Sequence, residues 1–288
     1  MSKPVIIVTG ANGQLGKELH ALEGTYSKFR FVFLSREDLP IHHFELVSNF
    51  FKAYKPNYLI NCAAYTAVDR AESERELAHL VNGTAPGILA SIGKEYGTKT
   101  IHISTDYVFA GDSPIPYKET DPTGPLSVYG ASKLAGEIKC MEGDPSSIII
   151  RTAWVYSTFG NNFVKTMLRL MEERPSISVV NDQIGAPTYA ADLAEAIMKI
   201  IDSGSWMPGI YHYSNAGKIS WYDFAKAIAE EIGDSTQITP IPSSHYPTAA
   251  QRPSFSLLDT QKIQDAFHLS IPHWRDSLKK CLNKIVKA

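Results

Sequence analysis

The sequence predicts an α/β protein with a doubly wound parallel sheet and a smaller α/β domain built largely from the C-terminal part. Three observations predict this fold. Short apolar runs alternate with helical stretches as far as Trp154, and the first run, residues 5–8, leads straight into a glycine-rich turn. Strands covered on both faces are typically continuous apolar runs of this kind. Beyond Trp154 the alternation continues in a looser form, which indicates the second domain.

The predicted elements follow one another in the order that a right-handed, doubly wound sheet needs. Its strands are expected at residues 5–8, 31–34, 58–63, 100–104 and 147–151. Its helices are expected at residues 14–22, 44–54, 73–96 and 128–141. In the second half, strands are expected at residues 177–180 and 209–213, and helices at residues 190–201 and 220–232. Ser220 is suited to cap the last of these helices.

Residues 240–253 carry four prolines and show no periodicity, which indicates a binding loop. We expect a first domain over residues 1–155, to which residues 189–215 return. The remaining part of residues 156–288 is expected to form a discontinuous substrate-binding domain.

The composition excludes several classes of protein. A net charge of −2 gives no electrostatic reason to expect a nucleic-acid partner, and the apolar runs are too short to span a membrane. Cys62, Cys140 and Cys281 are far apart, which argues against disulfides and against a zinc site. The nine histidines are scattered, and the pair His42–His43 lies outside any predicted element. With no signal-peptide pattern, we expect a cytoplasmic protein without a bound metal.

The turn after the first strand has glycine at every third position, Gly10, Gly13 and Gly16, and opens a predicted helix. Glycine allows a tight turn and lets backbone N–H groups approach a pyrophosphate at the positive end of the helix. This context predicts a Rossmann-like dinucleotide site; the alternative is a plain strand-to-helix turn.

The residues after the second strand bear on the choice of cofactor. An acidic residue there would bind the ribose 2′-hydroxyl of NAD, whereas arginine suits the extra phosphate of NADP. This chain has Ser35-Arg36, which favours NADPH over NADH, although Arg36 could instead pair with Glu37 on the surface.

Tyr129 and Lys133 are four residues apart on a predicted helix and therefore share one face. A free tyrosine has a pKa of about 10, so bringing it to neutrality costs about 4 kcal/mol. An ammonium at about 4 Å in a partly solvated cleft supplies that order of energy. We therefore expect Tyr129 to donate a proton to a carbonyl oxygen, with Lys133 lowering its pKa. The alternative is an ordinary surface helix, which leaves the small residues between them unexplained.

Ser104 and Thr105 end the fourth predicted strand, where open α/β sheets bind ligands. Either hydroxyl could hold the substrate oxygen against Tyr129. The alternative is that both hydroxyls only cap the strand end, and the sequence does not decide which of the two matters more.

Several longer segments carry a family resemblance: residues 10–16, 61–69, 104–109, 129–133, 151–156, 160–163, 181–188 and 252–253. On these segments, over essentially its whole length, the chain resembles the extended short-chain dehydrogenases/reductases, and within them the dTDP-4-dehydrorhamnose reductases. The resemblance implies reduction of the 4-keto group of dTDP-4-dehydro-β-L-rhamnose with NADPH or NADH, in the last step of dTDP-L-rhamnose synthesis. It implies a small-molecule nucleotide-sugar substrate and a monomer or homodimer.

The resemblance also implies roles for individual residues. Tyr129 is the implied proton donor, Lys133 binds the cofactor ribose and Thr105 tunes the active-site hydroxyl. With Ser104, which the strand-end argument adds, these residues are the predicted catalytic set. The cofactor-binding residues are Gly10, Asn12, Gly13, Gln14, Leu15, Gly16, Ser35, Arg36, Ala63, Ala64, Tyr65, Thr66, Tyr129 and Lys133. The substrate-binding residues are Val68, Thr105, Asp106, Tyr107, Trp154, Asn161, Asn162, Phe163 and Arg252.

Two of these roles have a clear physical basis. Trp154 would pack against the deoxysugar, whose methyl group needs apolar cover, and Arg252 would offer the diphosphate a forked cation. Residues 160–163 would meet the thymidine side. The alternatives are core packing for Trp154 and a solvated loop position for Arg252.

The chain departs from the family pattern in two places. Relatives commonly carry an aspartate near position 40 that touches the adenine, but this chain has Pro40, so the contact is lost or moves to Asp38. Some relatives dimerise through a magnesium ion held by glutamates. Glu18 matches one such position, but Ala191 stands where another is expected, which argues against Mg²⁺ here.

Two competing hypotheses use the same scaffold. A sugar-nucleotide 4,6-dehydratase or epimerase would place an acidic pair after the threonine, but here Asp106 is followed by Tyr107. A non-catalytic, NADP-sensing regulatory subunit would have no need of a tuned proton donor such as Tyr129.

Overall fold

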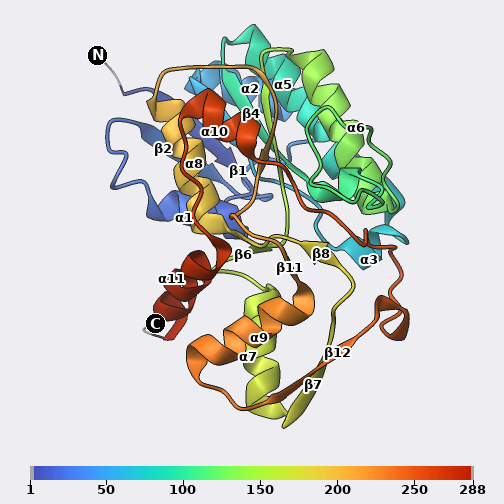
Figure 1. Cartoon of the computed structure of the whole chain (residues 1–288). Helices are drawn as coiled ribbons and strands as arrows, with labels where there is room; N and C mark the ends of the chain where they lie inside the picture. Colours follow the sequence, from blue (N-terminus) through green and yellow to red (C-terminus); the bar gives the residue numbers. More distant parts are fainter. Residues whose placement is uncertain (1–2, 287–288) are drawn as a thin grey trace.

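The centre of the molecule is a six-stranded, all-parallel sheet in the order β10–β5–β4–β3–β1–β2 (Figure 1). This computed structural model describes residues 3–286. The strands are β1 (Val5–Thr9), β2 (Arg30–Leu34), β3 (Tyr58–Asn61), β4 (Lys99–Thr105), β5 (Ile148–Thr152) and β10 (Gly209–Tyr213). The chain changes direction across the sheet between β1 and β3, and ligands of such sheets bind at the carboxyl ends beside that point.

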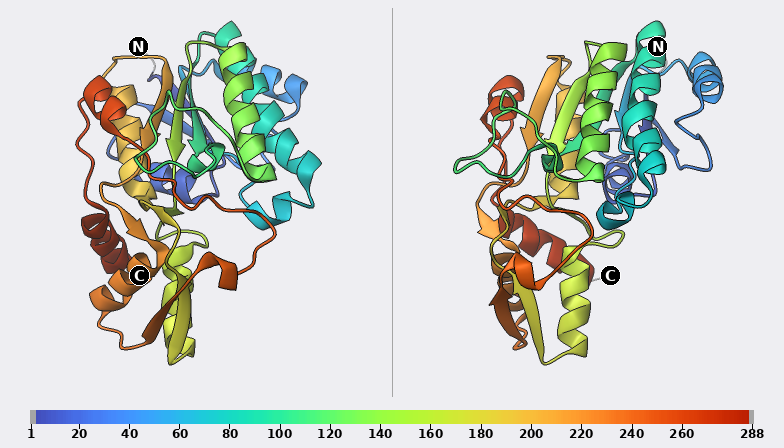
Figure 2. Two further views of the ribbon diagram at one scale, coloured as in Figure 1. Left: turned by 45° about the vertical axis from the view of Figure 1, so that its right-hand side comes forward. Right: turned by 90° about the vertical axis from the view of Figure 1, so that its right-hand side faces the viewer.

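Helices cover both faces of the sheet (Figure 2). One face carries α1 (Gln14–Ala21), α8 (Ala190–Asp202) and α10 (Gln261–Phe267). The other carries α2 (Phe44–Tyr54), α5 (Ala85–Glu95) and α6 (Val128–Gly143). Successive side chains of β1 serve these two layers: Ile6 and Val8 pack on the first and Ile7 on the second. The uninterrupted apolar run of β1 follows from this arrangement.

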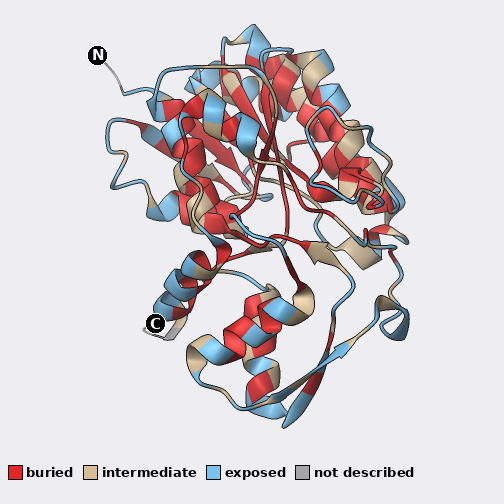
Figure 3. Ribbon diagram, in the orientation of Figure 1, coloured by how far each residue is buried: buried red, intermediate tan, exposed pale blue. Residues whose placement is uncertain are grey.

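A smaller lobe lies at the carboxyl end of the sheet and has a core of its own (Figures 1 and 3). It contains α7 (Phe163–Glu173), α9 (Trp221–Ile232), α11 (Trp274–Val286) and the parallel pair β7 (Ser176–Val180) and β12 (Gln237–Ile241). Two short pairings join it to the sheet side: β6 (Val155–Tyr156) with β9 (Thr188–Tyr189), and β8 (Ile184–Gly185) with β11 (Ile219–Ser220).

The α/β class and the doubly wound parallel sheet predicted from the sequence are confirmed. Residues 209–213 form β10 on β5, and α8 packs beside α1. Residues 261–267 also return to the sheet, as α10, beyond the segment that the sequence assigned to it.

Three local predictions need correction, and four helices were missed. The helix expected over residues 73–96 is three pieces, α4 (Arg75–Ala78), a π-helix (His79–Thr84) and α5. The third strand ends at Asn61, and the proline-rich loop begins inside β12. Helices α3 (Val68–Ala71), α7, α10 and α11 were not predicted. Within residues 3–286, no helix is both long and apolar enough to cross a membrane.

Candidate active site

One cavity of about 840 Å³ runs along the carboxyl ends of the strands. Every residue that the sequence predicts for the cofactor lines it, together with Ser104, Gly160 and Asn161. The sequence did not predict the other residues of its wall: Glu37, Leu39, Pro40, Ile41, His42, Cys62, Arg70, Glu74, Leu77, Val81, Ile103, Thr152, Val155 and Leu193.

The glycine-rich turn lets the backbone come close to a ligand. Gly10 has a φ of 70°, and a Cβ there would lie 2.6 Å from the Ala63 nitrogen. A Cβ on Gly16 would lie 2.5 Å from the Gly10 oxygen, so side chains are excluded at both positions. Gly13 is the N-cap of α1, with no side-chain cap bond to satisfy the N–H groups of its first turn. This cradle fits the pyrophosphate of a dinucleotide.

The end of β2 shapes the far part of the cavity. Ser35 and Arg36 line it, whereas the Asp38 carboxylate accepts a hydrogen bond from the Ser35 backbone N–H at 2.8 Å. The hydroxyl of Ser35, together with that backbone bond, holds the pKa of Asp38 below its usual value. Leu39 and Pro40 form an apolar wall here. Of the two expectations for the adenine contact, its loss or its transfer to Asp38, the engagement of the Asp38 carboxylate by the turn favours the first.

The wall at residues 63–66 is tied to the helix that carries Tyr129. Asn82, fully buried in the π-helix, accepts from the Tyr65 N–H at 2.8 Å and donates to the Tyr65 carbonyl at 3.0 Å. It also donates to the Ser132 hydroxyl of α6 at 3.0 Å. Sequence reasoning missed Asn82; an Asn-Gly pair inside a long helical stretch was the available signal.

Helix α6 presents Tyr129 and Lys133 to the cavity together. Ser127 caps the helix by accepting from the Gly130 N–H at 3.2 Å, which starts it one residue before Tyr129. The Lys133 ammonium donates to the Ile103 carbonyl at 2.5 Å. Burial lowers the pKa of Lys133 to about 8, and the Glu137 carboxylate opposes that shift.

The predicted lowering of the Tyr129 pKa by Lys133 is not found. Burial raises the pKa of Tyr129 to about 12; the neighbouring Thr105 hydroxyl lowers it and the Asp106 carboxylate raises it further. In this structure the ammonium points to Ile103, and desolvation of the phenolate outweighs the favourable contacts. Tyr129 is therefore a protonated donor over the whole neutral range.

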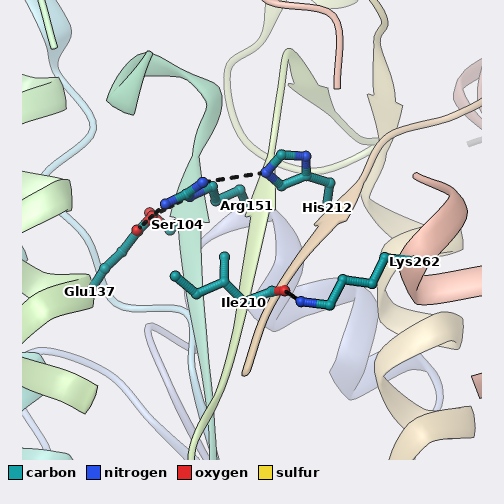
Figure 4. A network of polar contacts seen from close by, with 6 residues as sticks. All are labelled: Ser104, Glu137, Arg151, Ile210, His212 and Lys262. Atoms are coloured by element: carbon teal, nitrogen blue, oxygen red, sulfur yellow. Dashed lines mark hydrogen bonds and ion pairs between the residues drawn. The ribbon is translucent and has the colours of Figure 1, made fainter. Parts of the chain in front are cut away.

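The two strand-end hydroxyls have different surroundings. Ser104 donates to Glu137 Oε1 at 2.5 Å, and Arg151 holds the same carboxylate (Figure 4). Thr105 lies next to Tyr129, donates to Asp106 Oδ1 at 3.0 Å and accepts from the Tyr107 N–H at 3.3 Å. Of the two hydroxyls, that of Thr105 is beside the proton donor and that of Ser104 is engaged by a buried carboxylate.

Two predicted substrate residues, Asp106 and Tyr107, lie beside Tyr129, and a third, Trp154, lies against Trp221. The ring of Tyr107 meets Tyr129 edge to face at 5.5 Å. Asp106 is fully buried, which raises its pKa to about 6, while the Ser256 and Thr105 hydroxyls beside it oppose the rise. The indole of Trp154 stacks on Trp221, 3.7 Å between ring centroids.

Arg252 crosses from the proline-rich loop to α3. Its guanidinium donates twice to Asp69, at 3.1 Å and 2.8 Å, next to Val68 at the start of that helix. Asp69 also accepts from the Ala250 N–H at 3.1 Å, which fastens the loop to α3. Nη1 also donates to the Ala250 carbonyl at 3.1 Å, which leaves the Nε–H and one N–H of Nη2 to meet an anion.

The segment around residues 160–163 lies against the glycine-rich turn. Asn162 caps α7 by accepting from the Lys165 N–H and donates to Gln14 Oε1 at 3.0 Å. Asn161 lines the cavity beside it, whereas Phe163 packs on Trp221 in the small-lobe core. The segment therefore lies next to Gln14, a predicted cofactor residue.

No metal-binding cluster of three or more His, Cys, Asp or Glu residues occurs within residues 3–286. Glu18, the matched magnesium position of some relatives, is buried and accepts from the Ser157 hydroxyl at 2.6 Å. Its carboxylate is therefore already hydrogen-bonded within the chain.

Comparison with known proteins agrees with this geometry. The family profile "RmlD substrate binding domain" matches residues 4–287. The dTDP-4-dehydrorhamnose reductase of Escherichia coli is 40% identical over 291 residues, covering 97% of each chain. The spore coat polysaccharide biosynthesis protein SpsK of Bacillus subtilis is 42% identical over 279 residues, with 97% of each chain covered.

Solved structures give the same result. That of the dTDP-4-dehydrorhamnose reductase of Bacillus anthracis in complex with NADP has a TM-score of 0.94 and 40% identity, covering 98% of this chain and 100% of the other. The UDP-glucose 4-epimerase of Thermus thermophilus, at 20% identity and a TM-score of 0.83, covers 99% of both chains and shares the fold.

Proposed function

The chain belongs to the RmlD family of dTDP-4-dehydrorhamnose reductases, and we propose that it performs that reaction. It reduces the 4-keto group of dTDP-4-dehydro-β-L-rhamnose to the alcohol of dTDP-L-rhamnose, the last step of dTDP-rhamnose synthesis. The observation that carries this proposal is a single cavity that joins the glycine-rich cradle to Tyr129 and Lys133. Near-full-length identity of about 40% to named reductases supports the substrate.

Different residues of this chain have different roles in the reduction of a ketone. A bound nicotinamide cofactor supplies the hydride that goes to the carbonyl carbon. Tyr129 gives its phenolic proton to the carbonyl oxygen, so the oxygen becomes a hydroxyl as the carbon gains hydrogen. The Thr105 hydroxyl holds that oxygen beside Tyr129. Lys133, which lines the same cavity, would bind the ribose of the cofactor.

The cofactor is proposed to be NADPH, with NADH as a weaker alternative. Arg36 lines the far end of the cavity and no acidic side chain occupies position 35 or 36. A guanidinium favours the 2′-phosphate, whereas an acidic residue would favour the free hydroxyl. Asn12, Gln14 and the segment 63–66 complete the cofactor wall.

The nucleotide sugar is proposed to lie between the two lobes. Val68, Asp106 and Tyr107 border the sugar from the sheet side, and Trp154 covers it from the small-lobe side. Arg252 offers its remaining donors to the diphosphate, and Asn161, Asn162 and Phe163 close the pocket next to Gln14.

The remaining proposals concern the molecule as a whole. We place the cofactor domain in residues 1–155 together with residues 189–215, and the substrate domain in the rest of residues 156–288. The protein is proposed to work in the cytoplasm, as a monomer or homodimer without Mg²⁺, since Glu18 is engaged by Ser157. Neither a membrane nor a nucleic acid is proposed as a partner.

The test is to follow NADPH and NADH oxidation by the pure protein with enzymatically made dTDP-4-dehydro-β-L-rhamnose. Turnover with formation of dTDP-L-rhamnose is expected, faster with NADPH. Cofactor binding without turnover would overturn the proposal in favour of a cofactor-sensing subunit. Conversion of dTDP-glucose would instead indicate a dehydratase, which the Asp106-Tyr107 sequence argues against.

A further inference from the structure

Trp154 has a strained backbone. Its φ is 47°, in the left-handed region that a bulky side chain avoids. It directly follows β5 and Ala153, at the point where the chain leaves the sheet for the small lobe. Such strain persists only where the surroundings hold the residue in place, and it gathers at functional sites.

Three contacts hold Trp154 in this conformation. Its carbonyl accepts from the Thr188 N–H at 3.2 Å. Its indole ring lies against Gly185, where a Cβ would come within 3.0 Å of two ring carbons. The ring of Trp221 stacks on it with an interplanar angle of 12°. Of these three, the stack with Trp221 is the contact made by a side chain.

Trp221 is itself fixed by the small lobe. It is the first residue of α9, whose N-terminus is closed by a reciprocal pair of hydrogen bonds between Ser220 and Asp223. The ring of Phe163 packs against it at 4.6 Å. Trp154 packs against two apolar clusters. One lies on the sheet side and contains Phe109 and Tyr117, and the other is the core of the small lobe. The stacked pair therefore joins the two lobes.

The stack also lies close to the buried carboxyl of Asp106. Gly185 lies between Trp154 and the Ser256 hydroxyl, since its Cβ would come within 3.2 Å of that hydroxyl oxygen. Ser256 in turn lies beside Asp106, a neighbour of Thr105. One short chain of contacts thus leads from Trp221 to the groups expected to meet the sugar.

We propose that Trp221 is a positioning residue for the nucleotide-sugar substrate, because its stacked ring fixes the Trp154 indole that covers the sugar. The inference rests on the proposed function. It assigns Trp221 no contact with the reacting atoms, so the binding of the sugar depends on it more than the chemical step does.

The test compares Trp221→Leu and Trp221→Phe with the wild type. Leucine removes the stack, and KM for the nucleotide sugar is expected to rise about tenfold, the size of one aromatic pair. The kcat value and the Kd for NADPH are expected to change less than about twofold, since Tyr129, Thr105 and the glycine-rich turn are untouched. Phenylalanine keeps an aromatic face and should recover most of the loss.

Circular dichroism gives a readout that does not depend on activity. Two stacked indoles couple their transitions and produce a paired positive and negative signal. That signal should disappear equally in Trp221→Leu and Trp154→Leu. The matched control is Trp206→Leu, because Trp206 donates to the Ser146 carbonyl and its nearest ring, Tyr58, is tilted by 49°. It should keep both the signal and the wild-type KM.

The possible failures are distinguishable. If the wild type does not reduce the nucleotide sugar, the proposed function fails, and the spectra still report on the stack. If the wild type is active and both Trp221 variants keep its KM, the positioning role is wrong. A lower kcat with an unchanged KM in Trp221→Leu would show that only the amount of active protein had fallen. That result would also overturn the positioning role. Should the leucine variant not fold, Trp221→Met, which also removes the aromatic face, takes its place in the same KM comparison.

Discussion

Arg151 holds Glu137 through two hydrogen bonds, 2.9 Å from Nε to Oε1 and 2.7 Å from Nη2 to Oε2 (Figure 4). Both side chains are almost fully buried, at 3% and 2% exposure. The carboxylate also receives the Ser104 hydroxyl, and Arg151 approaches His212 Nε2 at 3.5 Å. This pair joins β4, β5, β10 and α6 directly behind the candidate active site.

Glu137→Gln is expected to destabilise the protein by about 3–5 kcal/mol, because it leaves the Arg151 charge buried without a counter-charge. The double variant Glu137→Leu with Arg151→Met should recover most of that loss, since replacing both charges avoids their desolvation. Urea denaturation measures both effects. If the free energy of unfolding of Glu137→Gln lay within about 1 kcal/mol of the wild-type value, this account would be contradicted.

Tyr129→Phe should lower kcat by about 10²–10⁴-fold, because it removes the hydroxyl that donates the proton, while NADPH binds as in the wild type, because the ring that lines the cavity is kept. Stopped-flow turnover and NADPH fluorescence titration report the two quantities separately. Tyr54→Phe, on an exposed position of α2, is the control and should change neither. Near-wild-type turnover would remove Tyr129 from its proposed role.

Thr105 and Ser104 should differ, although they are neighbours. Thr105→Val removes the hydroxyl beside Tyr129 and should lower kcat about tenfold to a hundredfold, the value of a hydrogen bond to a developing charge. Ser104→Ala removes a donor to Glu137 and should lower stability more than kcat. Turnover and thermal unfolding of both variants are the measurements, and the reverse ranking would move the catalytic hydroxyl to Ser104.

Arg36→Ala should raise KM for NADPH about tenfold and leave KM for NADH unchanged, because only the 2′-phosphate loses a charged partner. Arg30→Ala, at the amino end of β2 and thus at the opposite end of the strand from Arg36, serves as the control for net charge. An equal change in KM for NADPH and for NADH would show that Arg36 does not bind the 2′-phosphate.

Much of the fold follows from local pattern. The apolar run of β1 predicts a strand because both of its faces are covered, and Ser220 predicts the start of α9 because its hydroxyl accepts from the Asp223 N–H at 3.1 Å. Helix α7 was missed although Val164, Met167 and Met171 recur at helical spacing. The tertiary return of α10 to the sheet has no local signal, because it depends on contacts with distant residues.

The candidate site could likewise be predicted only in part from the sequence. Cofactor residues were predictable where backbone geometry dictates residue type, as at Gly10 and Gly16. Contacts made across the chain were not: Lys133 donates to Ile103, and Ser104 to Glu137. The left-handed backbone of Trp154 was equally hidden, since only its packing neighbours make that conformation stable.

Lys133→Met should stabilise the protein at pH 7 and lose this advantage as the pH rises. Burial lowers the pKa of Lys133 in the folded protein to about 8, from 10.5 for a free side chain. Between these values the unfolded chain binds more protons than the folded one, so wild-type stability rises with pH across this window, by about 3 kcal/mol in all. Below pH 8 both states carry the charge, and the cost of burying it is constant.

The measurement is the difference in unfolding free energy between Lys133→Met and the wild type at pH 7, 8, 9 and 10. The difference cancels the titration of other groups, and methionine keeps most of the side-chain volume. Lys139→Met, an exposed position two turns along α6, is the control and should show a flat difference. A flat profile for Lys133→Met as well would mean that the ammonium titrates at its ordinary pKa, and that its burial against Ile103 costs the fold little.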